Sequence, residues 1–587
     1  MENIEPLDII VILAYLVGIA ALGIYQVTRV KSSGDYFAGG RKFSKWMMIT
    51  HSLGSGTHAD DPVGVAGAAY ERGISGIWYT YAYLFCTPFY WIIAPFFRRS
   101  RYLTTADFFE ERFGKSLGLL YAIMGILTFS VNMGTLLKGT GTIVSSVVGT
   151  GTPEWFIKLA MMLQDFGIYL SWNPEWLAIW TMTAIFVAYG FAGGIIATVI
   201  TEFIQGFLIV IMSLLLIPYG IYKIGGFERL HSLIGDASKF SLSAPEEMTI
   251  PWIITATLIT LIGIVAQPHI MEVCSTGKTE FEGRVGFTYG NFIKRFCAMG
   301  WALCGLIVLA MVALPETSDL HIAGLEHREN AFGIAIGKLL PPGMTGLMFA
   351  SILAAQMSTL SAFMVAGSAL IARNIYKRYI APEASDKNIL ILARFGGFAV
   401  VGLGLVFCYL VEGVAEALTI FWGLSALTGV FVWAGVLWKK TNATGAWASF
   451  GVMAIIWLLL GPMGDKLLKP LMPDVSWLGL YGDKAHLPQL VLSYLPIGIV
   501  ALIVGSLLGK SLKKDVLEKF YLLIKTPVGR EEDLVKAGVN MIYKGHAEGH
   551  PWELKHPALV NWGGFAIGLV FAIAILGILY WLANVGT

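Results

Sequence analysis

The chain consists of long apolar runs separated by shorter polar segments. A helix needs about 20 apolar residues to cross a bilayer, and fourteen runs of roughly that length occur in these 587 residues. They lie at residues 7–29, 46–70, 74–97, 117–148, 174–191, 195–221, 251–272, 288–314, 344–372, 389–411, 414–437, 442–461, 489–509 and 558–584. This pattern predicts an all-α polytopic membrane protein with about 14 transmembrane helices.

Two of the runs carry polar interruptions. The second contains SLGSGTHADDPVGVAG at residues 52–67, and the seventh contains ITLIGIVAQPHIMEV at residues 259–273. Glycine and proline weaken a helix, and irregular backbone at membrane depth is tolerated only where it lines a cavity or is covered by protein. Adjacent carboxylates such as Asp60 and Asp61 are costly in a membrane and usually functional. Interrupted helices at corresponding places in two halves indicate a secondary transporter built from inverted repeats.

Composition and charge agree with a membrane protein and exclude other classes. Hydrophobic residues make up 56% of the chain and charged residues 14%, a balance that would leave a water-soluble protein with large exposed apolar patches. The net charge of +2 gives no reason to expect a nucleic-acid partner. Five scattered cysteines have neither metal-ligand nor disulfide spacing and are interpreted as packing residues.

Basic residues predict the orientation in the membrane. Lysines and arginines follow the first, third, seventh, ninth and eleventh runs and are frequent in the loop at residues 511–556. If every run crosses once, these segments share one side, which the positive-inside rule makes cytoplasmic. We therefore expect a multi-pass protein of the plasma (inner) membrane with both termini outside the cytoplasm. The acidic N-terminus, MENIEPLD, precedes a run without a signal cleavage motif, so the first run is expected to remain as a helix.

Several motifs in order along the chain resemble the sodium/solute symporter family, which includes sodium/glucose, sodium/proline and sialic acid symporters. The similarity extends from about residue 10 to 460. The matching segments are the GR of FAGGRKFS, then GVAGAAYERGI, TTADFFEERFG, GGIIATVITEFIQGF, ILAAQMSTLSAFMVAGSALIARNIYK and LWKKTNATGAWAS.

The resemblance implies a LeuT-like fold of two five-helix inverted repeats, with one extra helix before them and three after. The expected parts are an N-terminal extra helix at 1–30, a first repeat at 44–221, a second repeat at 250–438, additional helices at 439–510, a cytoplasmic loop at 511–556 and a C-terminal helix at 557–587. Transport would then proceed by alternating access.

The resemblance also implies a sodium site between the second and ninth helices. Its expected ligands are the carbonyls of Gly54, Thr57 and Ala355 and the hydroxyls of Ser358 and Thr359. Sodium is a hard cation that takes oxygen ligands, and an interrupted helix frees carbonyls for that purpose. The alternative is that the two hydroxyls only join transmembrane helices.

A second cation site exists in some members of the family, and here it would use Glu202 and Ser361. Glu202 stands where an Asp is usual, and Ala362 replaces a serine that would help, so one sodium per cycle is expected. Glu202 could also carry a proton, or be a structural carboxylate paired with Thr201 or a lysine.

The substrate pocket is expected between the interrupted helices and their neighbours. By resemblance, Asp61 falls where sugar-transporting relatives carry a histidine, Thr80 where they carry a glutamate, and Lys294 where they carry a lysine. Glu416 lies near a glutamine position. The full set of expected substrate residues is His58, Asp60, Asp61, Thr80, Gln267, His269, Lys294 and Glu416.

These residues favour a sodium-coupled importer of a sugar or polyol. A cationic or zwitterionic amine is the alternative, because carboxylates and the nearby aromatic rings can bind a cation. A third possibility is that the carboxylates pair with Lys294 or Lys138 and shape the pocket without touching the solute. Anions are disfavoured by the Asp pair unless Lys138 and Lys294 outweigh it. Two other classes are a transporter-like sensor and a membrane enzyme, but no nucleophile or third ligand accompanies Asp60 and Asp61. No further cluster completes a metal site with His51, His58 and Asp61. We expect the protein to function as a monomer, with sodium, the solute and the lipid bilayer as its partners.

Overall fold

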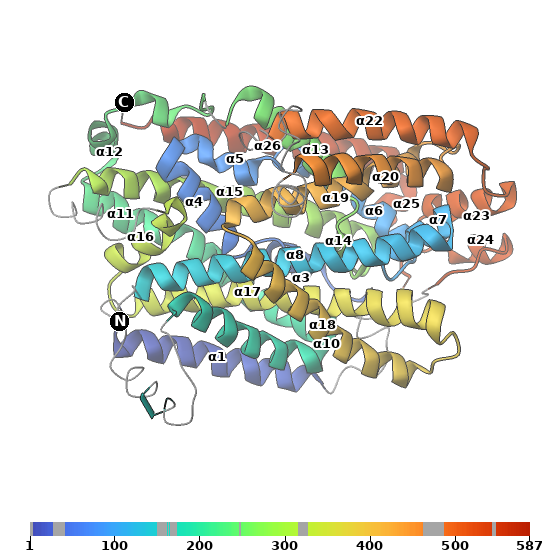
Figure 1. Ribbon diagram of the computed structural model, residues 1–587, viewed down its shortest axis with the longest axis horizontal. Helices are drawn as coiled ribbons and strands as arrows, with labels where there is room; N and C mark the ends of the chain where they lie inside the picture. Colours follow the sequence, from blue (N-terminus) through green and yellow to red (C-terminus); the bar gives the residue numbers. More distant parts are fainter. Residues whose placement is uncertain are drawn as a thin grey trace.

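A computed structural model describes residues 4–27, 41–148, 161–162, 164, 173–245, 248–314, 327–461, 487–542 and 547–586, with side chains left out at some positions inside helices. Throughout this described part the chain is helical, apart from turns and one isolated bridge between Phe43 and Gly277. Most helices run along the long axis of the molecule in an elongated bundle (Figure 1).

The helices of the bundle follow the predicted apolar runs. The first part contains α1 (Pro6–Val27), α3 (Lys45–Gly54), α4 (Asp60–Arg72), α6 (Thr87–Arg99), α7 (Thr105–Phe113), α8 (Lys115–Val148), α10 (Pro174–Leu214) and α11 (Leu216–Ile224). The second part contains α13 (Ile250–Ile264), α14 (Pro268–Ser275), α15 (Glu280–Val312), α16 (Ala331–Leu339), α17 (Met344–Ala369), η6 (Leu370–Ile380), α18 (Asp386–Leu410) and α19 (Val414–Leu437). The last part contains α20 (Ala443–Leu460), α22 (Leu487–Leu508), α23 (Lys514–Lys525), α24 (Glu531–Lys536), α25 (Pro551–Lys555) and α26 (Pro557–Ala583).

Both predicted interruptions are present. The second run is divided into α3 and α4, and the seventh into α13 and α14, which meet at an angle of 66°. The prolines that follow the breaks lie in the first turns of α4 and α14, where a missing N–H removes no intrahelical hydrogen bond. The polar interruptions therefore end one helix and start the next.

The number of membrane-spanning helices stays a prediction. All fourteen predicted runs contain helix, but within the described residues nine helices are long and apolar enough to cross a membrane, or ten if the bent pair counts as one span. The sequence predicted two helices, at 174–191 and 195–221, with a boundary between them. This boundary is wrong, because α10 is one continuous helix across it. Gly193 and Gly194 cost some helix stability but keep their N–H groups, so the hydrogen-bond ladder continues.

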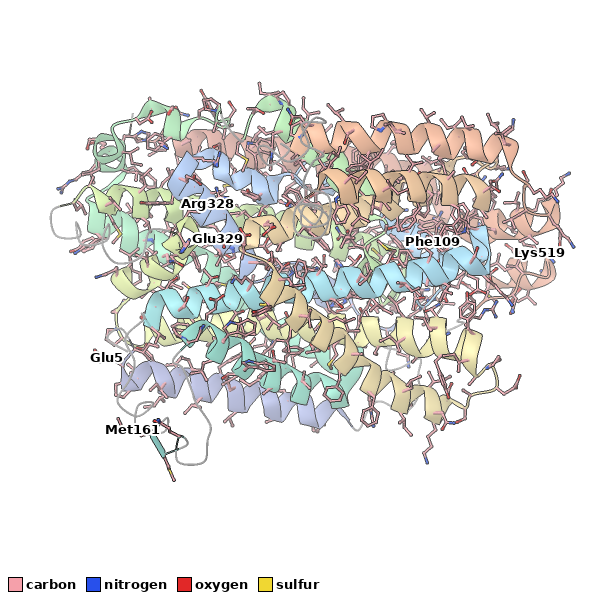
Figure 2. The ribbon with its side chains drawn as sticks, in the orientation of Figure 1. Glu5, Phe109, Met161, Arg328, Glu329 and Lys519 are labelled. Atoms are coloured by element: carbon pink, nitrogen blue, oxygen red, sulfur yellow. The ribbon has the colours of Figure 1, made fainter. Side chains whose placement is uncertain are left out.

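The two ends of the chain lie at the same end of the bundle. α1 begins and α26 ends on the left in Figure 1, whereas α23 and α24 lie at the right end. Figure 2 shows the same separation, with Glu5 toward one end and Lys519 at the other. This arrangement requires an even number of crossings. It agrees with placing residues 511–556 on the side opposite the termini.

The cysteine interpretation is confirmed. All five cysteines are buried, and none forms a disulfide bond: Cys86, Cys274, Cys297, Cys304 and Cys408.

Candidate functional site

The break between α3 and α4 brings two carboxylates into the interior. Asp60 and Asp61 occupy the first turn of α4, where the helix dipole and free N–H groups favour negative charge. The Asp61 carboxylate accepts the backbone N–H of His58 at 3.1 Å. α8 approaches closely at Gly139, where a Cβ would lie 2.8 Å from the Asp60 Cα. The aspartates are thus held by local capping and by close helix packing.

Four of the five expected sodium ligands lie together. The Thr359 and Ser358 hydroxyls donate to the Gly54 carbonyl at 2.8 and 3.3 Å, across the contact between α17 and the end of α3. The same hydroxyls lie 3.2 and 3.0 Å from the Ala355 carbonyl. The Thr57 side chain is completely buried, and its hydroxyl has no hydrogen-bond partner among the residues that the structure describes. An oxygen-only group without a fixed charge is the donor set that a hard monovalent cation requires.

Glu202 and Ser361 lie in the same region with partners of their own. Glu202 bonds His51 Nδ1 in a fully buried pair, so its partner is neither of the two that the sequence suggested. Gly54 lets α10 approach, because a Cβ there would lie 3.1 Å from Glu202 Cγ. Ser361 donates to the Ser358 carbonyl at 2.9 Å and lies 3.4 Å from the Thr198 hydroxyl.

A cavity of about 90 Å³ lies beside the break. It receives residues from both interrupted helices and from α8, α15, α17 and α19. Seven of the eight expected substrate residues line it: His58, Asp60, Asp61, Thr80, Gln267, His269 and Lys294. The eighth, Glu416, is absent from the lining, and its carboxylate accepts the Glu412 N–H at 3.1 Å. Further along α19, it is Leu418, Phe421 and Trp422 that line the cavity.

The acidic groups of the cavity are paired. Asp60 lies 2.8 Å from His58 Nδ1, and Asp61 lies 2.8 Å from Lys294 Nζ. Lys294 also donates to the Gly56 carbonyl at the break. The ligand atoms of His58, Asp60 and Asp61 all lie within 4.8 Å of one another, which metal binding could use. Each carboxylate nevertheless has a basic partner, which accounts for the cluster without an ion.

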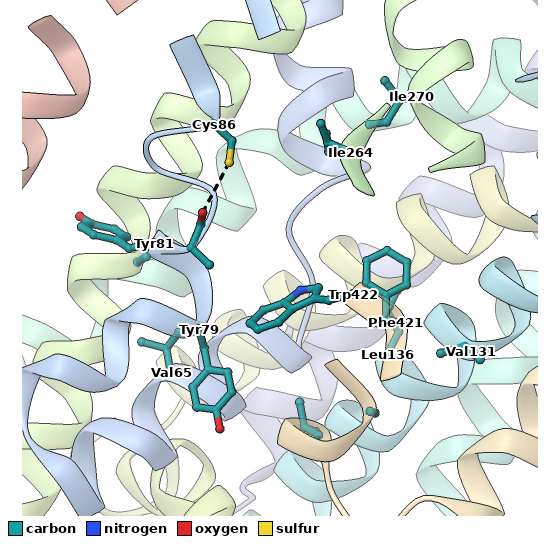
Figure 3. Close-up of a cluster of buried hydrophobic side chains, with 14 of the residues drawn as sticks. Val65, Tyr79, Tyr81, Cys86, Val131, Leu136, Ile264, Ile270, Phe421 and Trp422 are labelled. Atoms are coloured by element: carbon teal, nitrogen blue, oxygen red, sulfur yellow. Dashed lines mark hydrogen bonds between the residues drawn. The ribbon is translucent and has the colours of Figure 1, made fainter. Parts of the chain in front are cut away.

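One wall of the cavity is aromatic. The Trp422 ring lies 6.3 Å from Tyr79 and 6.4 Å from Tyr83, and Figure 3 shows Trp422 and Phe421 between the Tyr79 segment and α8. Gln267, at the α13–α14 break, donates to the Tyr83 hydroxyl at 3.2 Å. His269 packs against Phe363, with ring centroids 5.2 Å apart. Such rings present large apolar faces with a few polar groups at their edges.

The polar lining residues that the sequence reasoning missed include Asn132, Asn291 and Arg295. Two asparagines in long apolar helices gave little signal, because amides also join helices to one another. Arg295 had a clear signal. It directly follows Lys294 within a membrane-spanning run, where a second cation is expensive.

The combination of two interrupted helices, a polar cavity beside both, and an oxygen cluster at one break is the architecture of a secondary transporter. Comparison with known proteins identifies the family. Residues 36–452 match the sodium:solute symporter family, and the chain belongs to that family.

Several relatives cover most of the chain. The sodium/glucose cotransporter of Vibrio parahaemolyticus is 24% identical over 78% of this chain and 86% of its own length. The sodium/proline symporter of Haemophilus influenzae is 26% identical over 89% and 98%. The structure of a Na⁺-coupled sialic acid symporter in its substrate-bound outward-open state matches with a TM-score of 0.66 and 18% identity, covering 87% of this chain and 99% of that one.

The family assignment confirms the predicted class. The fold is the LeuT-like one, and the protein is a multi-pass, sodium-using transporter rather than an enzyme. The relatives differ in their solutes, which include glucose, proline and pantothenate.

Proposed function

We propose that this protein is a sodium-coupled symporter that imports a small polyhydroxylated solute, of the sugar or polyol class, by alternating access. One observation carries the sodium part of the proposal. Ser358 and Thr359 both reach the Gly54 carbonyl where α3 ends. A sodium ion bound among these oxygens, with the carbonyls of Thr57 and Ala355, would tie α17 to the interrupted helix that lines the cavity.

The pairing of charges supports a hydroxyl-rich solute over a cationic amine. Asp60 and Asp61 already have His58 and Lys294 as partners, so an ammonium group would have to displace one of them. Hydroxyls can instead accept from Lys294 and donate to the carboxylates, and hydrogen bonds to charged groups contribute about 1.5–3 kcal/mol each. The Trp422 and Tyr79 rings suit the apolar face of a sugar ring.

Coupling then follows from the shared break. Gly56, whose carbonyl accepts from Lys294, is two residues from Gly54. Sodium and solute therefore act on one short segment, and each raises the affinity of the other by the same factor. In the plasma membrane, with both termini outside, sodium entering down its gradient would drive import.

The test is accumulation of labelled solutes in proteoliposomes under an inward sodium gradient. Glucose, galactose, mannitol, proline and choline are compared, with potassium replacing sodium as the reference. Sodium-dependent accumulation of a hydroxylated solute is expected, and Asp61→Asn should abolish it while sodium binding persists. Accumulation of choline alone would favour the amine alternative. Binding without accumulation would favour a sensor.

A further inference from the structure

The cavity contains a second buried cation, Arg295 on α15, one residue after Lys294. Its side chain is almost completely enclosed, with the residue 2% exposed. Lys294 has the Asp61 carboxylate as its partner at 2.8 Å. Arg295 forms no ion pair with any carboxylate in the described part of the chain, so its positive charge lacks a direct counter-charge.

The contacts of the Arg295 guanidinium are weak or neutral. Nη2 donates to the Asn291 side-chain oxygen at 3.3 Å, the Tyr90 hydroxyl is a further polar neighbour, and the group lies 5.4 Å from the centroid of the Tyr83 ring. Nε and Nη1 are buried without a hydrogen-bond partner among the described residues. A buried guanidinium with two unsatisfied donors is costly. Such a group is best explained by an anion that completes it.

We propose that the transported solute carries a carboxylate, and that Arg295 recognises it. This inference rests on the proposed function and narrows its substrate class to sugar acids: polyhydroxylated monocarboxylates such as uronates and aldonates. A planar guanidinium matches a carboxylate by paired N–H···O bonds, which Lys294 cannot imitate.

The rest of the cavity suits the hydroxyl-bearing part of such a solute. Asn132 on α8 and His269 on α14 line the cavity, are at least nine-tenths buried, and have no side-chain hydrogen bond to any described residue. Both are neutral donors and acceptors suited to hydroxyl groups. Lys138, which the sequence offered as a counter-charge for anions, does not line the cavity and pairs with Glu175 at 2.8 Å.

The experiment compares matched pairs of solutes that differ only in the carboxylate: glucose with glucuronate, and galactose with galacturonate. Their dissociation constants are measured by calorimetry on the purified full-length protein, in sodium and in potassium, at pH 7. In sodium, the acid of at least one pair should bind at least about tenfold more tightly than its neutral partner.

Variants then assign the preference to one side chain. Arg295→Gln should remove the preference for the acid, and Arg295→Lys should retain part of it because the charge remains without the planar fork. Lys138→Gln, a basic residue outside the cavity, is the matched control and should leave the preference unchanged. Retention of sodium binding by each variant shows that it is folded.

The outcomes separate this inference from the proposed function. Equal or tighter sodium-dependent binding of the neutral sugars overturns the carboxylate and leaves the sugar symporter in place. An unchanged preference in folded Arg295→Gln overturns the role of Arg295. If neither member of any pair binds in a sodium-dependent way, the proposed function falls and this inference falls with it. Should Arg295→Gln fail to fold, the comparison on the wild-type protein alone still decides whether the carboxylate matters.

Discussion

At the scale of single residues, two adjacent hydroxyls are the most specific part of the proposed sodium site. Ser358 and Thr359 both lie within hydrogen-bond distance of the Gly54 and Ala355 carbonyls. Replacing both by alanine removes two of the five proposed sodium ligands and leaves only the three backbone carbonyls of Gly54, Thr57 and Ala355. We predict that sodium-stimulated uptake in proteoliposomes falls at least about a hundredfold, because each lost ligand to a cation contributes about 1.5 kcal/mol or more.

The control for this variant lies on the same helix. Ser351 is equally buried on α17 but donates only to the Leu347 carbonyl, at 2.8 Å. Ser351→Ala should keep its stimulation by sodium. Unchanged uptake in the double variant would remove the proposed ion site.

The second residue-scale prediction concerns pH. Burial raises the pKa of Glu553 to about 7, although the neighbouring Arg284 opposes the shift. A carboxyl whose pKa is higher in the folded protein stabilises the fold below its unfolded value of 4.5, and this stabilisation is lost as pH rises through about 7. Relative to Glu553→Gln, the wild-type protein should therefore lose ~2 kcal/mol of stability between pH 5 and pH 8.

Thermal unfolding of both proteins across that pH range measures the difference. Glu532→Gln, at an exposed position on α24, is the control and should follow the wild-type pH dependence. A constant offset between wild type and Glu553→Gln would show that this carboxyl does not titrate in the range.

Some contacts between single residues could be predicted from the sequence, and others could not. The pairing of His58 with Asp60 is local and could be anticipated from their spacing, and the family motif predicted that Lys294 lies near the Asp pair. The Glu202–His51 pair joins helices 151 residues apart, and no local pattern encodes such a contact. Arg295 was missed because the motif assigned a role to Lys294 alone.

At the scale of elements, the sequence predicted the breaks better than the boundaries. Pro62 and Pro268 come directly after polar residues, and each marks the start of a new helix. Gly193 and Gly194 have no such effect, because glycine keeps the N–H that proline lacks. A proline that follows polar residues therefore predicts an interrupted helix from the sequence. For a glycine pair, tertiary packing decides whether the helix continues.

A contact between α1 and α17 carries the element-scale prediction. Asp8, buried on α1, accepts the N–H groups of Gly343 and Gly346 at 2.7 and 2.6 Å and so caps α17, the helix of Ser358 and Thr359. Because an N-terminal cap contributes about 0.5–2 kcal/mol and this one is a buried carboxylate, Asp8→Ala should lower thermal stability and weaken sodium binding together. Glu5→Gln, exposed on the same segment, should change neither. If Asp8→Ala is less stable than the wild type but binds sodium equally tightly, the cap does not position the proposed ion site.

At the scale of the whole molecule, residues 514–542 and 547–555 form what we call the strap, which lies at one end of the bundle. The strap joins parts of the chain that are far apart in sequence. The Val528 N–H donates to Glu280 at 2.7 Å, Lys278 pairs with Glu548 at 2.8 Å, and Arg284 pairs with Glu553. These contacts lie at the start of α15, next to the end of the interrupted helix α14. The strap thus contacts the helix that carries Lys294 and Arg295.

Arg101, between α6 and α7, makes several hydrogen bonds to this strap. It is buried, has a φ of 52°, and donates to the carbonyls of Leu523, Thr526 and Pro527 and to the Glu531 carboxylate. A left-handed φ is unfavourable for arginine, so these four acceptors must stabilise it. Arg101→Met leaves them without a donor, and we predict that trypsin cleaves between residues 513 and 536 at least about tenfold faster in the folded protein. Lys42→Met, an exposed basic position, should leave the rate unchanged. If Arg101→Met is cleaved at the wild-type rate, Arg101 does not hold the strap in place. The contacts of the strap with Lys278, Glu280 and Arg284 would then be sufficient.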